Sequence, residues 1–219
     1  MVSLSSPRTA GPLLLRLASS PRPALMQAPD AGPDAPAGPA PGSVDERIEL
    51  SGTVLVNWAA KTAGLLADEG LTPGDTLRVD LPEHWLCHAL TLGALVAEAR
   101  LGFGGPQGPA PAFVLTDRPQ AWTDPSVTVL HVRLPRGLAP QAEGVPHPDP
   151  AVVDVATEIR AQPDALPGPA AHVHADSLDA PDGLDVPGTA DDAGPRLDRA
   201  RAAAALRTWG AGGTVTVRG

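Results

Sequence analysis

The segment LTPGDTLRVDLPEHW, residues 71–85, constrains the fold of this chain more than any other stretch. Pro73 fixes one backbone angle and Gly74 tolerates a positive one, and a type II turn needs that pair of residues. Apolar residues then occupy alternate positions, at Leu77, Val79 and Leu81. This alternation predicts a strand with one face more buried than the other. Pro82 ends the strand and suits the first turn of a following helix.

A strand and a helix are predicted upstream of this segment. Residues 48–50 alternate between apolar and polar, and Ser51 favours the N-cap position of the helix that follows. The apolar side of that helix carries Leu55, Trp58, Leu65 and Leu66. Gly70 then suits the left-handed residue of a Schellman ending, with Leu71 making the accompanying hydrophobic contact.

A second helix is predicted downstream, over about residues 83–97, where Glu83 complements the positive end of the helix dipole. Small residues on one side of it, such as Ala89 and Gly93, are expected to let the helix lie close against a sheet. Residues 100–105 form the next predicted strand, which gives a β-α-β unit with a right-handed crossover.

The remaining elements predict an α/β fold with a mostly parallel sheet flanked by helices. Two further strands are expected at 112–117 and 126–134, a helix at 196–209 ending before Gly210, and a strand at 213–219. Three zones rich in Pro, Gly, Ala or Asp separate the ordered parts: 28–44, 135–150 and 163–195. Residues 163–195 are expected to be irregular, exposed and mobile, and the amides of 170–194 to exchange at near-random-coil rates.

These patterns divide the chain into five parts. They are an N-terminal helix and leader (1–27), a Pro/Ala/Gly-rich insertion (28–44), an α/β core (45–134), an irregular segment (135–195), and a terminal helix and strand that pack on the core (196–219).

Charge and composition exclude several classes of protein. The net charge of −9 and the lack of a Lys/Arg cluster argue against nucleic-acid binding. No apolar run approaches the roughly 20 residues of a membrane helix. The N-terminal GPLLLRLASS makes a poor signal peptide and is expected to be a short amphipathic helix. Cys87 is the only cysteine, so we expect a buried inert thiol, a reducing compartment and a cytoplasmic location.

Residues 48–103 resemble the N-terminal segment of adenylate-forming, AMP-binding enzymes such as acyl-CoA synthetases. In those enzymes a strand and an "LS/TY" phrase open a helix, and "PGD-V-L-LP" and a second helix leading to "GA" follow. The matching residues here are Leu50-Ser51, Leu65-Leu66, Pro73-Gly74-Asp75, Leu81-Pro82 and Leu101-Gly102. The phrase NWAAKTAGLL resembles a group of short actinobacterial proteins related to that superfamily. The short length of the chain is also similar to the length of those proteins.

The resemblance covers scaffold and leaves out the family's chemistry. Between residues 117 and 196 there is no Gly/Ser/Thr-rich loop to hold ATP phosphates, and the chain has no tyrosine for the Tyr-Gly-x-Thr-Glu motif. The lysine that contacts the acyl-adenylate belongs to a separate domain in that family, whereas Lys61 lies on the first predicted helix. We therefore predict no catalytic residue and no cofactor, with ATP or AMP as the alternative cofactor.

Other groups of residues suggest sites, and each has a simpler structural explanation. GAGGT, residues 210–214, follows a helix and precedes a strand, the reverse of the order in a phosphate loop, so a helix-to-strand turn is favoured. Four residues of 172–182 could ligate a metal: His172, His174, Asp176 and Asp179. They lack a second ligand cluster, so a solvated acidic loop is favoured and no metal site is predicted.

A second pair of histidines and a pair of carboxylates complete the candidates. His84 and His88 are one helical turn apart without an HExxH pattern, which favours an ordinary helix face. Asp75 is expected to bond nearby backbone in its turn, and neither it nor Asp80 is assigned a catalytic role. Trp58 and Trp85 are interpreted as packing residues. Ser3, Ser5 and Ser6 lie outside any G-x-S-x-G elbow.

Three functional hypotheses remain open. The first is a non-catalytic, truncated homologue of AMP-binding synthetases that acts as a small-ligand or protein-binding module, with an unknown protein or small molecule as partner. The alternative is a nucleotide- or acyl-binding subunit that contributes to a ligase reaction with a partner domain. The third is a degenerate gene product under little constraint.

Overall fold

Two sheets organise the computed structural model, which describes residues 12–28, 47–135, 147–166, 170, 172–180, 183–186 and 195–218. The larger sheet has five strands in the order β4-β3-β5-β6-β7, all parallel. Its strands are β3 (Thr76–Asp80), β4 (Arg100–Phe103), β5 (Phe113–Thr116), β6 (Thr128–His131) and β7 (Val153–Asp154). The α/β class and the parallel sheet predicted from the sequence are therefore confirmed.

The smaller sheet joins the two ends of the described chain. Its strands are β1 (Pro23–Ala28), β2 (Ile48–Ser51) and β8 (Val215–Arg218), in the order β2-β1-β8. β1 pairs with β2 antiparallel and with β8 parallel. No strand was predicted at β1, because PALMQA carries no clear alternation and both of its partner strands are distant in sequence.

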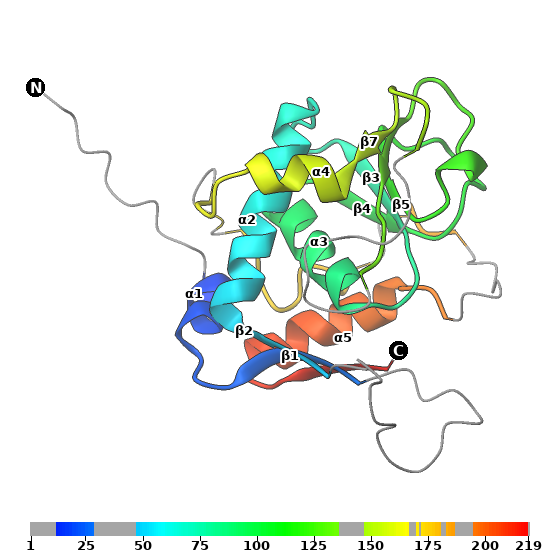
Figure 1. Ribbon diagram of the computed structural model, residues 1–219. Helices are drawn as coiled ribbons and strands as arrows, with labels where there is room; N and C mark the ends of the chain where they lie inside the picture. Colours follow the sequence, from blue (N-terminus) through cyan, green and yellow to red (C-terminus); the bar gives the residue numbers. More distant parts are fainter. Residues whose placement is uncertain are drawn as a thin grey trace, which may run out of the picture.

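Helices cover one face of the larger sheet, as Figure 1 shows. The helices are α1 (Pro12–Ser19), α2 (Gly52–Asp68), α3 (Trp85–Val96), α4 (Val155–Glu158) and α5 (Arg199–Gly210), with short 3-10 turns η1 (Pro119–Ala121) and η2 (Ile159–Ala161). α3 is buried along its whole length, and α2 packs on it. None of the described helices is long and apolar enough to cross a membrane.

Gly93, on the small side of α3, faces a helix and not the sheet that was expected there. A Cβ built on Gly93 would lie 2.3 Å from Cβ of Thr62 and 2.8 Å from the carbonyl oxygen of Ala59, both on α2. Gly93 therefore sets the close approach of α2 and α3.

The predicted caps of α2 are confirmed. The Ser51 hydroxyl accepts a hydrogen bond from the Val54 amide, and Gly70 has a φ of +91°. The Gly70 amide donates to Ala67 and the Leu71 amide to Leu66, which is the bond pattern of a Schellman ending.

The start of α3 differs from the prediction, because His84 is its N-cap and Pro82 and Glu83 precede the helix. Pro82 instead forms an isolated antiparallel bridge with Arg196. At the far end of the chain, Gly210 is the last residue of α5, and Gly212 carries the positive φ. Residues 210–214 make a turn from α5 to β8, as expected for a helix-to-strand connection.

The segment 135–195 has more structure than its composition indicated. β7, α4 and η2 lie within it. Ala170, Val173 and Leu178 are buried in the main core, so the expectation of an exposed 163–195 is wrong for these residues. Insertion 28–44 lies outside the described residues apart from Ala28, which ends β1.

Candidate functional site

Strand β3 buries both of its faces, whereas its alternation predicted one face to be more buried than the other. Leu77 and Val79 face the core under α3. Arg78 and Asp80, on the opposite face, are only 2% and 0% exposed. Loops cover this second face, so a charged pair of residues is enclosed beneath irregular segments rather than exposed to water.

The Asp80 carboxylate accepts hydrogen bonds from three side chains and forms an ion pair with a fourth, at the carboxyl end of the sheet. Arg118 binds it through Nε at 3.2 Å and Nη2 at 2.8 Å, and Arg196 Nε lies 3.0 Å away. Trp122 Nε1 donates at 3.1 Å and the Thr116 hydroxyl at 3.3 Å. These contacts engage both oxygens of the carboxylate, so its hydrogen-bonding capacity is used within the protein.

Arg78 fastens two loops onto the same face. Its Nη1 donates to the carbonyls of Gly105 and Gln107, and its Nη2 donates to those of Pro109 and Leu184, at 2.7–3.3 Å. Burial lowers the pKa of this guanidinium from its usual value, opposed by the nearby charge of Asp80. These contacts fix the loops around 105–109 and at 184, which assigns Arg78 a structural role.

The other carboxylate considered from the sequence serves its turn. The Asp75 carboxylate accepts from the Thr72 amide at 2.7 Å and from the Thr72 hydroxyl at 2.8 Å. These hydrogen bonds lower the pKa of Asp75. The Asp75 amide bonds to the Thr72 carbonyl and Gly74 has a φ of +92°, as a type II turn requires.

The histidine candidates form no metal site among the described residues. His84 Nδ1 accepts the Leu86 amide, and its Nε2 contacts the Pro135 carbonyl. His88 faces Glu83 at 3.9 Å. His172 Nε2 lies 2.8 Å from the Leu95 carbonyl, which ties this histidine to the end of α3.

The two remaining candidates are also engaged or buried. Cys87 is fully buried, and burial raises the pKa of its thiol, as an inert side chain requires. Lys61 lies on α2, where its ammonium donates to the Gln162 carbonyl and pairs with Asp164 at 3.2 Å.

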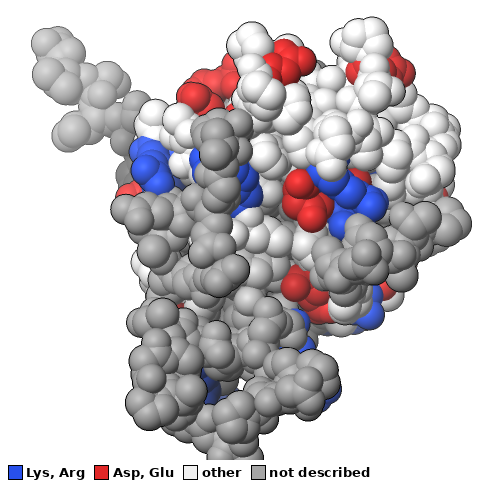
Figure 2. Space-filling model, turned by 45° about the vertical axis from the view of Figure 1, so that its right-hand side comes forward, with Lys and Arg blue, Asp and Glu red and all other residues white. Residues whose placement is uncertain are grey.

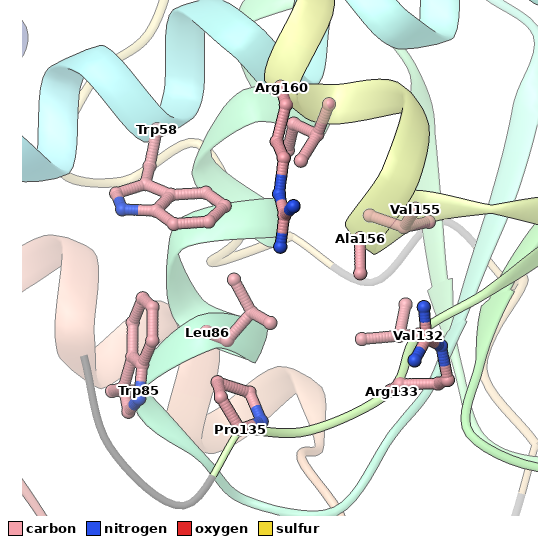
Figure 3. A pocket seen from close by; sticks show the side chains of 10 residues that line it. Trp58, Trp85, Leu86, Val132, Arg133, Pro135, Val155, Ala156 and Arg160 are labelled. Carbon is pink, nitrogen blue, oxygen red and sulfur yellow. The ribbon is translucent and has the colours of Figure 1, made fainter. Parts of the chain in front are cut away.

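A pocket with an apolar wall lies between α2, α3, the end of β6 and the α4–η2 turn (Figure 3). Its apolar wall consists of Trp58, Trp85, Leu86, Val132, Val155 and Ile159. The rings of Trp58 and Trp85 meet edge to face with centroids 5.5 Å apart. The Arg160 side chain extends from η2 into the space between the tryptophans and the α4 side (Figure 3). The enclosed volume is about 40 Å³.

A wider hollow of about 310 Å³ continues this pocket along α2 and shares Trp58, Ile159 and Arg160 with it. We call the pocket and the hollow together the tryptophan groove. Trp85 packs as expected, being 1% exposed, but Trp58 is only half-buried and forms part of the groove wall. The sequence signal that could have identified the groove was an amphipathic helix with a tryptophan at its margin.

On the face shown in Figure 2, basic and acidic side chains of the described residues lie interspersed, with no broad patch of one sign. This distribution differs from the clustered Lys and Arg of a nucleic-acid interface.

The fold is similar to that of solved acyl-CoA synthetases. An acyl-CoA synthetase of Brucella canis superposes with a TM-score of 0.50 at 18% identity, over 76% of this chain and 30% of that one. The N-terminal domain of FACL13 from Mycobacterium tuberculosis matches with a TM-score of 0.44 at 18% identity, over 71% of this chain and 36% of that one. The chain thus shares its fold with about 30% of the Brucella canis synthetase, and at this identity the likeness concerns the fold alone.

Sequence comparison adds a short match. One relative is a Mycobacterium tuberculosis protein whose name consists of a family number. It is 49% identical to this chain over 49 residues, which cover 22% of this chain and 20% of that protein. No family model matches the sequence. The chain thus matches about a fifth of that relative and less than a third of the Brucella synthetase.

Proposed function

We propose that this chain is a non-catalytic binding module built on an AMP-binding scaffold, with the tryptophan groove as its binding site. The observation that supports this proposal is the groove itself. It combines an apolar wall, two tryptophans and cationic side chains on ordered elements. Tryptophan and arginine are the residues most enriched at binding hot spots.

The engagement of Asp80 supports the non-catalytic half of the proposal. In open parallel sheets, ligands bind beyond the carboxyl ends of the strands. At that place in this chain the carboxylate of Asp80 is bound by Arg118, Arg196 and Trp122. Through these contacts Asp80 stabilises the surrounding loops, and we infer that it does not act on a substrate.

A measurement of pyrophosphate release tests the absence of adenylation. The purified chain is incubated with ATP, Mg²⁺ and a panel of aliphatic and aromatic carboxylic acids. We expect release at the rate of a buffer blank. Turnover that depends on both ATP and an acid would refute the non-catalytic assignment.

A second candidate function, nucleotide or acyl binding as part of a ligase, is favoured by a separate cavity. It measures about 380 Å³ and lies beyond β4, lined by Phe103 and Gly104 and by the first residues of α5. This volume falls within the usual range of small-molecule sites. Arg196, Arg199 and Arg201 line the cavity together with Asp185 and Asp198.

Thermal unfolding with ATP, AMP and an acyl-CoA separates the two functions. A ligand at about 100 times its Kd raises stability by about 2.7 kcal/mol. Ala200 is exposed and lines the cavity, so Ala200→Trp fills it without disturbing the core. A shift with ATP or acyl-CoA that Ala200→Trp abolishes would favour the ligase subunit, and no shift favours the binding module.

A further inference from the structure

Strand β4 is one edge of the larger sheet, and residues 183–186, which we call the edge strap, lie along its outer side. The backbone amides of Arg100 and Gly104 donate toward β3. Alternate residues of a parallel strand turn their polar groups to the same side, so Leu101 and Phe103 direct theirs outward. Outward groups of this kind are a template for pairing with another chain.

The edge strap and helix α5 engage these outward groups. The Phe103 carbonyl accepts a hydrogen bond from the Val186 amide at 2.9 Å, and the Phe103 amide donates to the Asp185 carboxylate at 3.0 Å. The Leu101 carbonyl accepts from Arg199, which also pairs with Asp185 at 2.6 Å. A side-chain carboxylate therefore stands where a further strand would present a backbone carbonyl. Charged side chains at a sheet edge are one of the devices that stop further pairing.

Glycines in and after β4 allow the edge strap to lie this close. A Cβ built on Gly102 would lie 2.6 Å from the Leu184 carbonyl oxygen, and one on Gly104 would lie 2.3 Å from the Val186 carbonyl oxygen. Gly104 also has a φ of +111°, whereas Gly102 has no positive φ. The close approach of the strap, and not the backbone conformation, therefore requires glycine at position 102. Arg78 adds a hydrogen bond to the Leu184 carbonyl at 3.3 Å from the covered face of the sheet.

We propose that the edge strap is a displaceable cover that prevents β4 from pairing with β4 of a second copy of the chain. Residues 101–104 have the sequence LGFG, without the charge or proline that protects many edge strands, so the strap supplies this protection. Two identical edges related by a twofold axis can satisfy each other's outward groups in antiparallel pairing. Asp185 is exposed, and neither Leu184 nor Val186 belongs to the buried core, so the strap leaves β4 without opening that core. This device is independent of the tryptophan groove and goes beyond the proposed binding function.

Hydrogen exchange of the full chain at several protein concentrations, combined with sedimentation, tests the role of the edge strap. In the wild-type protein we expect a protected Phe103 amide and a monomer at every concentration. In Asp185→Ala, the Phe103 amide should exchange about tenfold faster or more in dilute solution, because its acceptor is lost. At higher concentration a dimer should form and the protection of Phe103 should return, because the second β4 replaces the strap. The Val79 amide, in the centre of β3, should stay protected throughout and shows that the sheet is intact.

Three further variants separate the contacts of the edge strap. Asp185→Asn keeps an oxygen that accepts the Phe103 amide but loses the ion pair with Arg199, so its effect should be smaller than that of Asp185→Ala. Gly102→Ala displaces the strap from the side of β4 and should expose the same amide. Asp179→Ala is the matched control, since Asp179 is also exposed and also pairs with an arginine of α5, Arg207, but lies outside the strap. It should leave both the exchange of Phe103 and the monomer unchanged.

Several results would overturn this assignment of the edge strap. Fast exchange of the Phe103 amide in the wild-type protein would show that the strap does not cover β4 in solution. Unchanged exchange in Asp185→Ala, or an equal change in Asp179→Ala, would show that the strap contacts do not protect the edge. An exposed Phe103 amide in a chain that stays monomeric at every concentration, or a dimer in which this amide stays unprotected, would show that β4 does not pair with a second copy. If Gly102→Ala fails to fold, the comparison of the two Asp185 variants decides.

Discussion

Gly70 and Glu98 occupy the same position in two helix endings, with φ values of +91° and +61°. Each follows the C-cap of its helix, α2 or α3. The Leu71 amide donates to Leu66 at 2.8 Å, and the Ala99 amide donates to Ala94 at 3.0 Å, so both endings are Schellman motifs. Only glycine adopts this conformation without strain, so the end of α3 carries a cost that the end of α2 avoids.

Exchanging these two residue types should therefore change stability in opposite directions. We expect Glu98→Gly to stabilise the protein by about 1 kcal/mol and Gly70→Glu to destabilise it by about the same amount. A Cβ at position 70 would meet no atom within 4 Å, so its effect reports backbone conformation alone. Urea denaturation of both variants checks the pair. Changes of the same sign would show that packing, not φ, controls these sites.

The contact between α2 and α3 gives a second prediction. Gly93→Ala places a methyl group 2.3 Å from Cβ of Thr62, and overpacking of this kind costs about 1–3 kcal/mol. Gly64→Ala is the control on α2, because its methyl group meets only the flexible end of Gln162. There the gain in helix propensity, about 1 kcal/mol, should leave stability equal or higher. Thermal unfolding compares the two, and equal losses would contradict the close approach at Gly93.

Features set by neighbouring residues were predictable from the sequence. The type II turn at Gly74, the Ser51 cap and the ending at Gly70 each depend on a few adjacent residues. The alternation in β3 correctly identified a strand, because it records which residues reach the helix-covered face. Local signals of this kind are independent of the rest of the fold.

Features that depend on distant segments were not predictable. Arg78 and Asp80 were expected on the less buried face, but Arg78 is covered by segments near residues 105–109 and 184, and Asp80 by Arg118 and Arg196. The tryptophan groove likewise requires α2, α3, the end of β6 and η2 to meet. No short sequence pattern encodes contacts between distant segments, since each contact depends on the tertiary arrangement of the chain.

The network around Asp80 gives a third prediction. Asp80→Asn keeps the shape of the side chain but removes the buried carboxylate that Arg118 and Arg196 share, which leaves Arg196 paired with Asp117 alone. Removing one partner of a buried ion pair costs about 3–5 kcal/mol. We expect a loss of that order in urea denaturation, with Asp75→Asn as a control that has a much smaller effect because Asp75 lies in an exposed turn. Similar losses in both variants would show that the Asp80 network contributes little.

The last prediction concerns pH and the N-cap of α3. Nδ1 of His84 accepts the Leu86 amide at 3.2 Å, so the ring proton lies on Nε2 and is donated to the Pro135 carbonyl. Burial lowers the pKa of His84 from 6.5 to about 4, with the Pro135 hydrogen bond opposing the shift and the charge of His88 adding to it. Protonation would also remove the acceptor that caps the helix.

Because the folded pKa of His84 lies below the unfolded value, the unfolded chain binds this proton first as the pH falls. His84 therefore contributes stability that is complete above about pH 6.5 and is lost as the pH falls toward about 4. The loss amounts to about 3 kcal/mol at 1.36 kcal/mol per pH unit. His84→Asn retains a capping oxygen and does not titrate, which makes it the matched control. The difference in unfolding free energy between the two proteins should be constant above pH 6.5 and should change steadily below it. Parallel curves down to pH 4 would show that His84 titrates normally and is not held neutral by its surroundings.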